Sequence, residues 1–96
     1  MSKTEIIDLL KKHKTEIQQK YPVANLALFG SYARGDDTPD SDIDIMVEFN
    51  GPIGWEMVDL LEYLEALFTK MKVDLVSKDG IKPRLWPYIQ KDLIYA

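Results

Sequence analysis

Hydrophobic side chains in the first twenty residues recur at three- and four-residue steps, the spacing of one face of an α-helix. This stripe consists of Ile6, Leu9, Leu10, His13 and Ile17. Ser2-Lys3-Thr4-Glu5 ahead of it has the form of a capping box, and Pro22 disfavours helical geometry at Tyr21. We therefore expect an amphipathic helix of about four turns that ends before Tyr21. The apolar residues 23–29 that follow predict a short strand buried on both faces.

The centre of the chain passes from a loop pattern to an alternating pattern. Residues 32–41 are dense in Gly, Pro, Asp and Ser, which predicts a loop with a short helical turn at its start. In residues 42–49 the apolar side chains alternate with other residues, which predicts a strand with one apolar face. Helical spacing returns over about residues 55–70, and residues 72–77 predict a third short strand.

The tail, residues 81–96, predicts mostly helix, broken in two near Pro87 because proline suits the first turn of a helix and not its interior. The resulting order is helix, strand, loop, strand, helix, strand, helix. It predicts an α/β (α+β) fold in which helices pack on a small mixed sheet. No repeat, linker or low-complexity segment interrupts residues 1–96, which we interpret as a single domain.

Composition narrows the classes of function. The 96 residues carry a formal net charge of −4, and a nucleic-acid coat protein would need a basic surface instead, so we expect no stable nucleic-acid binding. The chain has no cysteine, which excludes disulfides and thiolate metal sites, so a metal would be bound by oxygen. Its longest apolar run, Leu26 to Phe29, is far too short for a membrane helix, and we expect a cytoplasmic protein without membrane contact.

Asp42 and Asp44 are the first candidates for chemistry. Two residues apart on a strand, their carboxylates leave the same face with Cα atoms about 6.5 Å apart, a spacing that suits one or two divalent cations. Acidic residues are depleted in strands and like charges repel, so the pattern is unfavourable without a cation. The alternative is an exposed edge strand on which the acids only maintain solubility.

Two further features favour the cation. Asp74 lies in Val73-Asp74-Leu75-Val76, so a third carboxylate joins the pair if the two strands are neighbours. Mg²⁺ prefers carboxylates, water and substrate phosphates as ligands. Gly30-Ser31 stands where the first strand ends and a helical turn begins, a place that presents backbone N–H groups and a hydroxyl to a phosphate.

The order of these features resembles a known signature. It consists of a strand, Gly-Ser, a spacer of ten residues, Asp-x-Asp and a later aspartate on another strand. The segment GSYARGDDTPDSDIDIMVEF is similar to that of the DNA polymerase beta-like nucleotidyltransferase superfamily. More closely, the chain resembles the minimal nucleotidyltransferases, or MNT proteins, and among them the MntA-type antitoxins of HEPN/MNT toxin–antitoxin pairs. The resemblance extends over nearly the whole chain and implies a nucleotidyltransferase-like fold.

The resemblance also implies roles for particular residues. Gly30 and Ser31 would bind the nucleotide phosphates, and Asp42 and Asp44 would hold two Mg²⁺ ions. Asp74 would share one metal and help to deprotonate the attacking hydroxyl. Arg34 would contact a phosphate, although a structural bridge to an aspartate of the neighbouring loop fits the sequence equally well.

The implied activity is transfer of AMP from ATP to a hydroxyl, most readily to a tyrosine of a partner HEPN toxin. Two alternatives remain: an antitoxin that neutralises its toxin by contact alone, and a transferase acting on a small molecule. One core of this size leaves no second lobe to enclose a small acceptor, whereas an open site admits a protruding side chain. The acidic row Glu56, Asp59, Glu62 and Glu65 could meet a basic partner or could be a solvated helix face.

Other conspicuous residues are interpreted as structural. His13 lies on the apolar stripe of the first helix, and a packing or boundary role is expected. Tyr32, beside the phosphate loop, could stack on a base or pack in the core. Trp86-Pro87 departs from the charged helix that the resemblance implies at this point.

Overall fold

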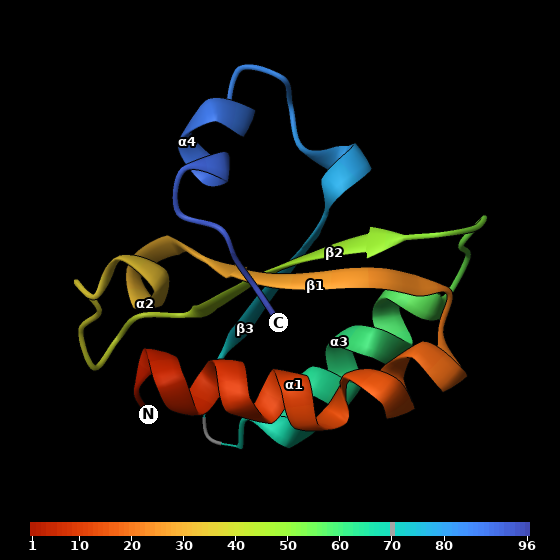
Figure 1. The fold of residues 1–96 in the computed structure, drawn as a ribbon, viewed down its shortest axis with the longest axis horizontal. Helices are drawn as coiled ribbons and strands as arrows, with labels where there is room; N and C mark the ends of the chain where they lie inside the picture. The colour runs from red at the N-terminus through yellow and green to blue at the C-terminus, as the bar shows by residue number, and fades with distance from the viewer. Residues whose placement is uncertain (70) are drawn as a thin grey trace.

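The computed structural model describes residues 1–69 and 71–96, in which helices cover one face of a mixed sheet (Figure 1). The strands are β1 (Val23–Phe29), β2 (Ile43–Phe49), β3 (Val73–Ser77) and β4 (Ile94–Tyr95). Their spatial order is β3-β2-β1-β4. β1 runs antiparallel to both β2 and β4, whereas β2 and β3 are parallel, so the expected mixed sheet is confirmed.

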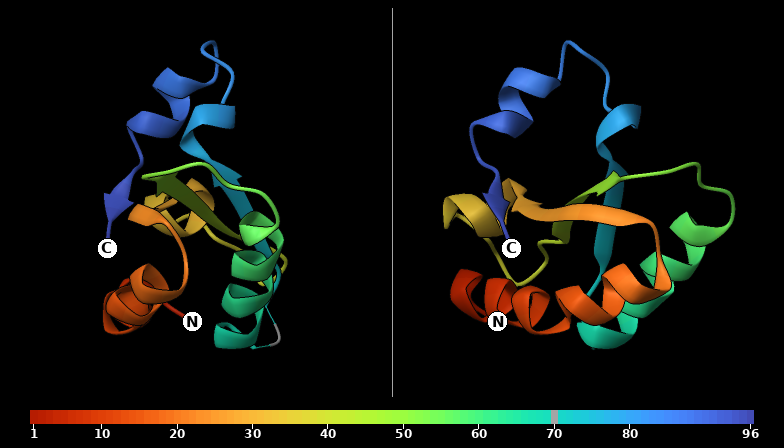
Figure 2. Two further views of the ribbon diagram at one scale, coloured as in Figure 1. Left: turned by 90° about the vertical axis from the view of Figure 1, so that its right-hand side faces the viewer. Right: turned by 45° about the vertical axis from the view of Figure 1, so that its right-hand side comes forward.

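Two long helices, α1 (Lys3–Lys20) and α3 (Glu56–Leu67), lie on the same face of the sheet (Figure 2). The capping box at the start of α1 is confirmed: the Ser2 hydroxyl accepts from the backbone N–H of Glu5 at 3.2 Å, and the Glu5 carboxylate accepts from that of Ser2. α3 ends three residues before the predicted limit at Lys70, a residue that lies outside the described part of the chain.

Between these layers lies the hydrophobic core. α1 contributes Ile6, Leu10 and Ile17, and α3 contributes Leu60 and Leu64, all of them fully buried. The sheet contributes alternate residues of its two central strands, which are Leu26, Leu28, Ile43, Ile45 and Val47. His13 takes the expected boundary position, with Nδ1 lying 3.2 Å from the hydroxyl of Tyr63 on α3. Tyr32 is buried in the same core, so packing is its role in this structure.

The opposite face of the sheet is crossed by a C-terminal arch, which we define as residues 78–93 (Figure 1). The arch contains the 3₁₀ turn η1 (Lys78–Gly80) and the short helix α4 (Trp86–Gln90). Pro87 stands in the first turn of α4, as expected from its fixed φ and missing N–H.

The prediction of a mostly helical tail was wrong. The tail is mostly irregular, and it ends in β4 and not in a helix, because Tyr95 and Ile94 pair with Ala27 and Leu28 on the free edge of β1. Met46, which alternates along β2 with the residues that face the helices, is fully buried on the other face of the sheet.

β2 lies between β1 and β3, in the interior of the sheet. The interpretation of residues 42–49 as an exposed edge strand is therefore wrong, and its two acids need another explanation. No helix among the described residues is long and apolar enough to cross a membrane.

Candidate active site

The turn from β1 into the short helix α2 (Gly30–Arg34) is built around a glycine that cannot be replaced without strain. Gly30 has φ +75°, a conformation that L side chains rarely adopt. A Cβ atom at this position would lie 2.9 Å from Cγ of Asp44 and closer still to its Oδ2. The backbone at the start of α2 therefore packs directly against the Asp44 carboxylate.

Ser31 follows at the first turn of α2, where its carbonyl accepts hydrogen bonds from the N–H groups of Gly35 and Asp36. Its side chain is partly buried, and no hydrogen bond is made by its hydroxyl to any group in residues 1–69 and 71–96. The Ser31 hydroxyl, one residue after the glycine that packs against Asp44, is thus available to a ligand.

The sheet register brings the predicted acids to one place. In the parallel pairing of β2 and β3, Asp44 stands directly opposite Asp74, which puts their Cα atoms about 5 Å apart. Asp42 lies just before β2. Asp42 and Asp44 are partly buried and Asp74 is exposed. The expectation that the two strands are neighbours is confirmed, and it brings Asp74 beside Asp44.

The electrostatics of this cluster are unfavourable for an isolated anion. Burial in the first place, and then the negative charges of Asp74 and Asp42, raise the pKa of Asp44 to about 6 from its usual 3.8. The positive charge of Arg34 opposes this shift without cancelling it. Among the described residues, no lysine, arginine or histidine forms an ion pair with any of the three carboxylates.

An uncompensated set of carboxylate oxygens fits a hard divalent cation such as Mg²⁺. However, in the part of the chain that the structure describes, no three His, Cys, Asp or Glu side chains are grouped so that they could hold a metal ion by themselves. Mg²⁺ commonly takes one or two carboxylates together with water and substrate phosphates. The donor set therefore suits an ion whose coordination a bound nucleotide completes.

Arg34, at the end of α2, makes two ion pairs with carboxylates. Its Nε lies 3.1 Å from Asp36 in the adjacent loop, and its Nη1 lies 3.2 Å from Asp92 near the end of the arch. The first of these contacts is the loop bridge that the sequence left open. The second joins residues 58 positions apart, so no local pattern could have indicated Asp92.

A shallow pocket of about 280 Å³ lies elsewhere, between the first turns of α1 and β4. Its lining contains none of the predicted site residues, and consists of Lys3, Thr4, Ile7, Asp8, Lys11 and Ile94. The pocket is therefore separate from the carboxylate cluster.

A Gly-Ser turn packed against paired strand carboxylates, on a mixed sheet covered by helices, is the arrangement expected of a nucleotidyl-transferring enzyme. The sequence profile of the family described as "Nucleotidyltransferase domain" matches residues 10–96 of this chain. The chain belongs to that family and is a nucleotidyltransferase.

Similar proteins carry more specific names. The chain is 50% identical over 97 residues to "Putative protein adenylyltransferase MJ1379" of Methanocaldococcus jannaschii, with 97% of this chain and 96% of the relative covered. It is 38% identical over 93 residues to the protein adenylyltransferase MntA of Thermococcus cleftensis, with 96% and 93% covered. It therefore falls among the MntA-like members of the family.

Solved structures agree with the fold. A protein described as a "putative minimal nucleotidyltransferase" superposes with a TM-score of 0.72 at 28% identity, covering 98% of this chain and 95% of that one. A toxin–antitoxin structure with AMP-PNP gives 0.70 at 24% identity, covering 99% and 72%. A complex of a tri-AMPylated HEPN toxin with an MNT antitoxin from Shewanella oneidensis gives 0.60 at 22% identity, covering 97% and 66%.

Proposed function

We propose that this chain transfers AMP from ATP to a tyrosine hydroxyl of a HEPN toxin, in a Mg²⁺-dependent reaction that neutralises the toxin. The observation that carries the chemistry is the pairing of Asp44 with Asp74 beside Gly30. The direction towards a protein acceptor rests on relatives named as protein adenylyltransferases and on the solved complex of an AMPylated HEPN toxin. In this proposal residues 1–96 act as one minimal nucleotidyltransferase domain.

Five of the predicted residues have a role in the proposed reaction. The N–H groups at the start of α2 and the Ser31 hydroxyl bind phosphate oxygens, at the point where Gly30 lets the backbone approach Asp44. Asp42 and Asp44 would hold two Mg²⁺ ions, with Asp74 as a ligand of one of them. When bound, the ions supply charge neutralisation for the triphosphate and lower the pKa of the acceptor hydroxyl.

In this proposal Asp74 receives the acceptor's proton; the exposure of Asp74, the exposed member of the cluster, supports this role. The acceptor oxygen then attacks the α-phosphorus, and pyrophosphate leaves on the opposite side. The arch lies on the face of the sheet opposite α1 and α3 (Figure 2). In this proposal a side chain of the other protein enters beside the exposed Asp74.

The test is incubation of the purified chain with a HEPN toxin, Mg²⁺ and ATP. We expect the toxin to gain the mass of AMP on a tyrosine and to lose its ribonuclease activity. The matched control is the Asp42→Asn, Asp44→Asn double variant. Silencing of the toxin by this variant, without added mass, would show an antitoxin that acts by contact alone.

A second reaction series omits the toxin and varies the metal. Because the described side chains form no closed cage for an ion, we expect Mg²⁺ to bind weakly to the free protein and tightly only in the presence of ATP. Tight Mg²⁺ binding without nucleotide, measured by calorimetry, would contradict this account of the site.

A further inference from the structure

The five tyrosines of the chain differ in how their hydroxyl groups are used. Tyr32 is buried in the core. Tyr63 donates to Glu16 at 2.9 Å, and Tyr95 donates to Glu48 at 3.0 Å. Tyr21 is partly buried, and its hydroxyl lies 3.5 Å from a backbone carbonyl of α3. These four phenols are enclosed or engaged in the fold.

Tyr88 is different. Its side chain is 67% exposed, and its hydroxyl makes no hydrogen bond to any group in residues 1–69 and 71–96. It lies on α4, directly after the Trp86-Pro87 pair that the family resemblance did not explain. An exposed tyrosine with a free hydroxyl has the form of the acceptor that the proposed function requires.

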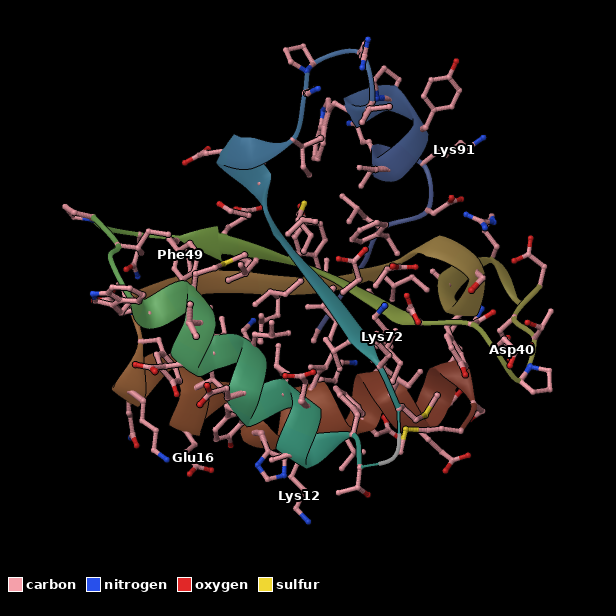
Figure 3. The ribbon with its side chains drawn as sticks, turned by 180° about the vertical axis from the view of Figure 1, so that it is seen from behind. Lys12, Glu16, Asp40, Phe49, Lys72 and Lys91 are labelled. Atoms are coloured by element: carbon pink, nitrogen blue, oxygen red, sulfur yellow. The ribbon has the colours of Figure 1, made fainter. Side chains whose placement is uncertain are left out.

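The surroundings of Tyr88 are basic. The Lys91 Nζ lies 5.8 Å from the centre of its ring. The arch, residues 78–93, carries four basic side chains and two acidic ones, in a protein whose net charge is −4. Figure 3 shows Lys91 beside α4, far from Lys12 and Glu16 on the helical layer. The arch therefore complements a site that holds three carboxylates and a nucleotide triphosphate.

The exposure of Tyr88 allows its hydroxyl to reach a second copy of the enzyme. Arg34 of α2 pairs with Asp92, which ties the end of the arch to α2. Among the described residues, no hydrogen bond joins Tyr88 to Gly30, Ser31 or the three carboxylates, and its side chain is 67% exposed. The Tyr88 hydroxyl can therefore enter the site of another copy of the chain.

We propose that this chain also adenylylates itself, with Tyr88 of one copy as acceptor in the active site of another. The inference rests on the proposed nucleotidyl transfer and extends it to a second substrate. The Tyr88 oxygen forms a bond to the α-phosphorus of ATP, and the bond from that phosphorus to the bridging oxygen breaks. Pyrophosphate leaves with the electron pair, and the phenolic proton passes to Asp74.

The test separates enzyme from acceptor. The enzyme is the Tyr88→Phe variant, and the acceptor is an affinity-tagged Asp42→Asn, Asp44→Asn double variant that retains Tyr88. After incubation with Mg²⁺ and ATP, we expect the acceptor to gain the mass of one AMP, located at Tyr88 by peptide mass spectrometry. The same acceptor with Tyr88→Phe added should gain none, whereas Tyr95→Phe, the next most exposed tyrosine, should leave labelling unchanged.

Three outcomes would overturn the inference. The first is labelling of the acceptor that lacks Tyr88, and the second is self-labelling of the wild type at a rate per molecule independent of protein concentration, which would mean reaction within one copy. The third is absence of labelling by an enzyme that still adenylylates a HEPN toxin. If that enzyme modifies neither protein, the proposed function fails together with the inference. The reaction with the toxin therefore distinguishes failure of the inference alone from failure of the proposed function.

Discussion

The two faces of the sheet are held by different kinds of interaction. On the helical side, Ile43, Ile45 and Val47 of β2 are fully buried against α1 and α3, in a core without a buried polar residue among those described. On the arch side, the intervening residues are Asp44, Met46 and Glu48, and only the methionine is fully buried. One face stabilises the fold, and the other carries charge at some cost to it.

On the arch side of the sheet, polar contacts at Glu48 join segments that are far apart in the sequence. Glu48 accepts hydrogen bonds from the Tyr95 hydroxyl at 3.0 Å and from the Asn25 amide at 3.4 Å, and Lys78 lies 3.5 Å from the same carboxylate. Such partly exposed contacts are each worth little, on the order of 1 kcal/mol or less. Because these contacts contribute little, the buried core on the helical face must offset the free-energy cost of the carboxylate cluster on the opposite side.

Replacement of Asp44 should distinguish most clearly between the face that carries activity and the face that provides stability. Asp44→Asn removes a proposed metal ligand, so nucleotidyl transfer should fall by roughly 10³-fold or more. Wild-type rates of AMP incorporation by this variant would show that the site is wrong.

The same substitution should leave the fold intact or stabilise it. The folded pKa of about 6 is raised above the usual 3.8, so Asp44 favours folding when protonated and loses this contribution as pH rises through about 6. Above that pH, Asp44→Asn should be more stable than metal-free wild type by about 1 to 2 kcal/mol, allowing for screening of a partly exposed group. Urea denaturation at pH 4 and pH 7.5 checks this, and we expect the gain only at the higher pH.

These two faces were not equally predictable from the sequence. The helical face follows from local periodicity, so α1 and the strand at 23–29 have the predicted bounds to within a residue or two. Asp42, Asp44 and the Gly-Ser turn were recognisable because an unusual residue pattern lies within fifteen positions. The proximity of Asp74 required only the assumption that two predicted strands are neighbours.

The arch was predicted poorly because its structure depends on partners far along the chain. β4 forms through the free edge of β1, some 65 residues away. Residues 92–96 contain helix-compatible side chains, and nothing local distinguishes a two-residue strand from a helical end. The Arg34–Asp92 pair is hidden for the same reason.

Asp74→Asn should have the next largest effect. A group that mainly receives the acceptor's proton affects turnover more than ATP binding, so we expect a loss of about 10²-fold in kcat with a smaller change in ATP affinity. Rapid-quench kinetics and calorimetry measure the two quantities. Equal losses in both would make Asp74 a plain metal ligand.

Gly30→Ala tests whether the close approach of α2 to Asp44 adds to the cost in folding stability that the backbone conformation of Gly30 alone would cause. Gly35 provides the matched control, because its φ is +83° but an added Cβ would meet nothing within 4 Å. Gly35→Ala should cost about 1 kcal/mol of folding stability from its conformation alone. Gly30→Ala should cost about 2 to 4 kcal/mol, since displacement of the Asp44 carboxylate is added. Similar thermal unfolding for both variants would contradict this packing.

The smallest expected effect concerns Arg34, for which two roles remain: a phosphate contact and an anchor for the arch. Its side chain is 44% exposed and that of Asp92 is 15% exposed, so loss of their ion pair should lower folding stability only slightly. As an anchor only, Arg34→Gln and Asp92→Asn should be equally destabilising, with unchanged KM for ATP.

As a phosphate ligand, Arg34→Gln should raise that KM severalfold, whereas Asp92→Asn should leave it unchanged or lower it, because the guanidinium loses a competing carboxylate. The ion pair between Arg34 and Asp92 favours the anchor, and the pair with Asp36 occupies the guanidinium further. Yet Asp36 is 62% exposed, so an incoming triphosphate could displace it from the guanidinium at little cost. Steady-state kinetics of the two single variants and the double variant therefore decide whether Arg34 belongs to the catalytic face or only holds the arch to it.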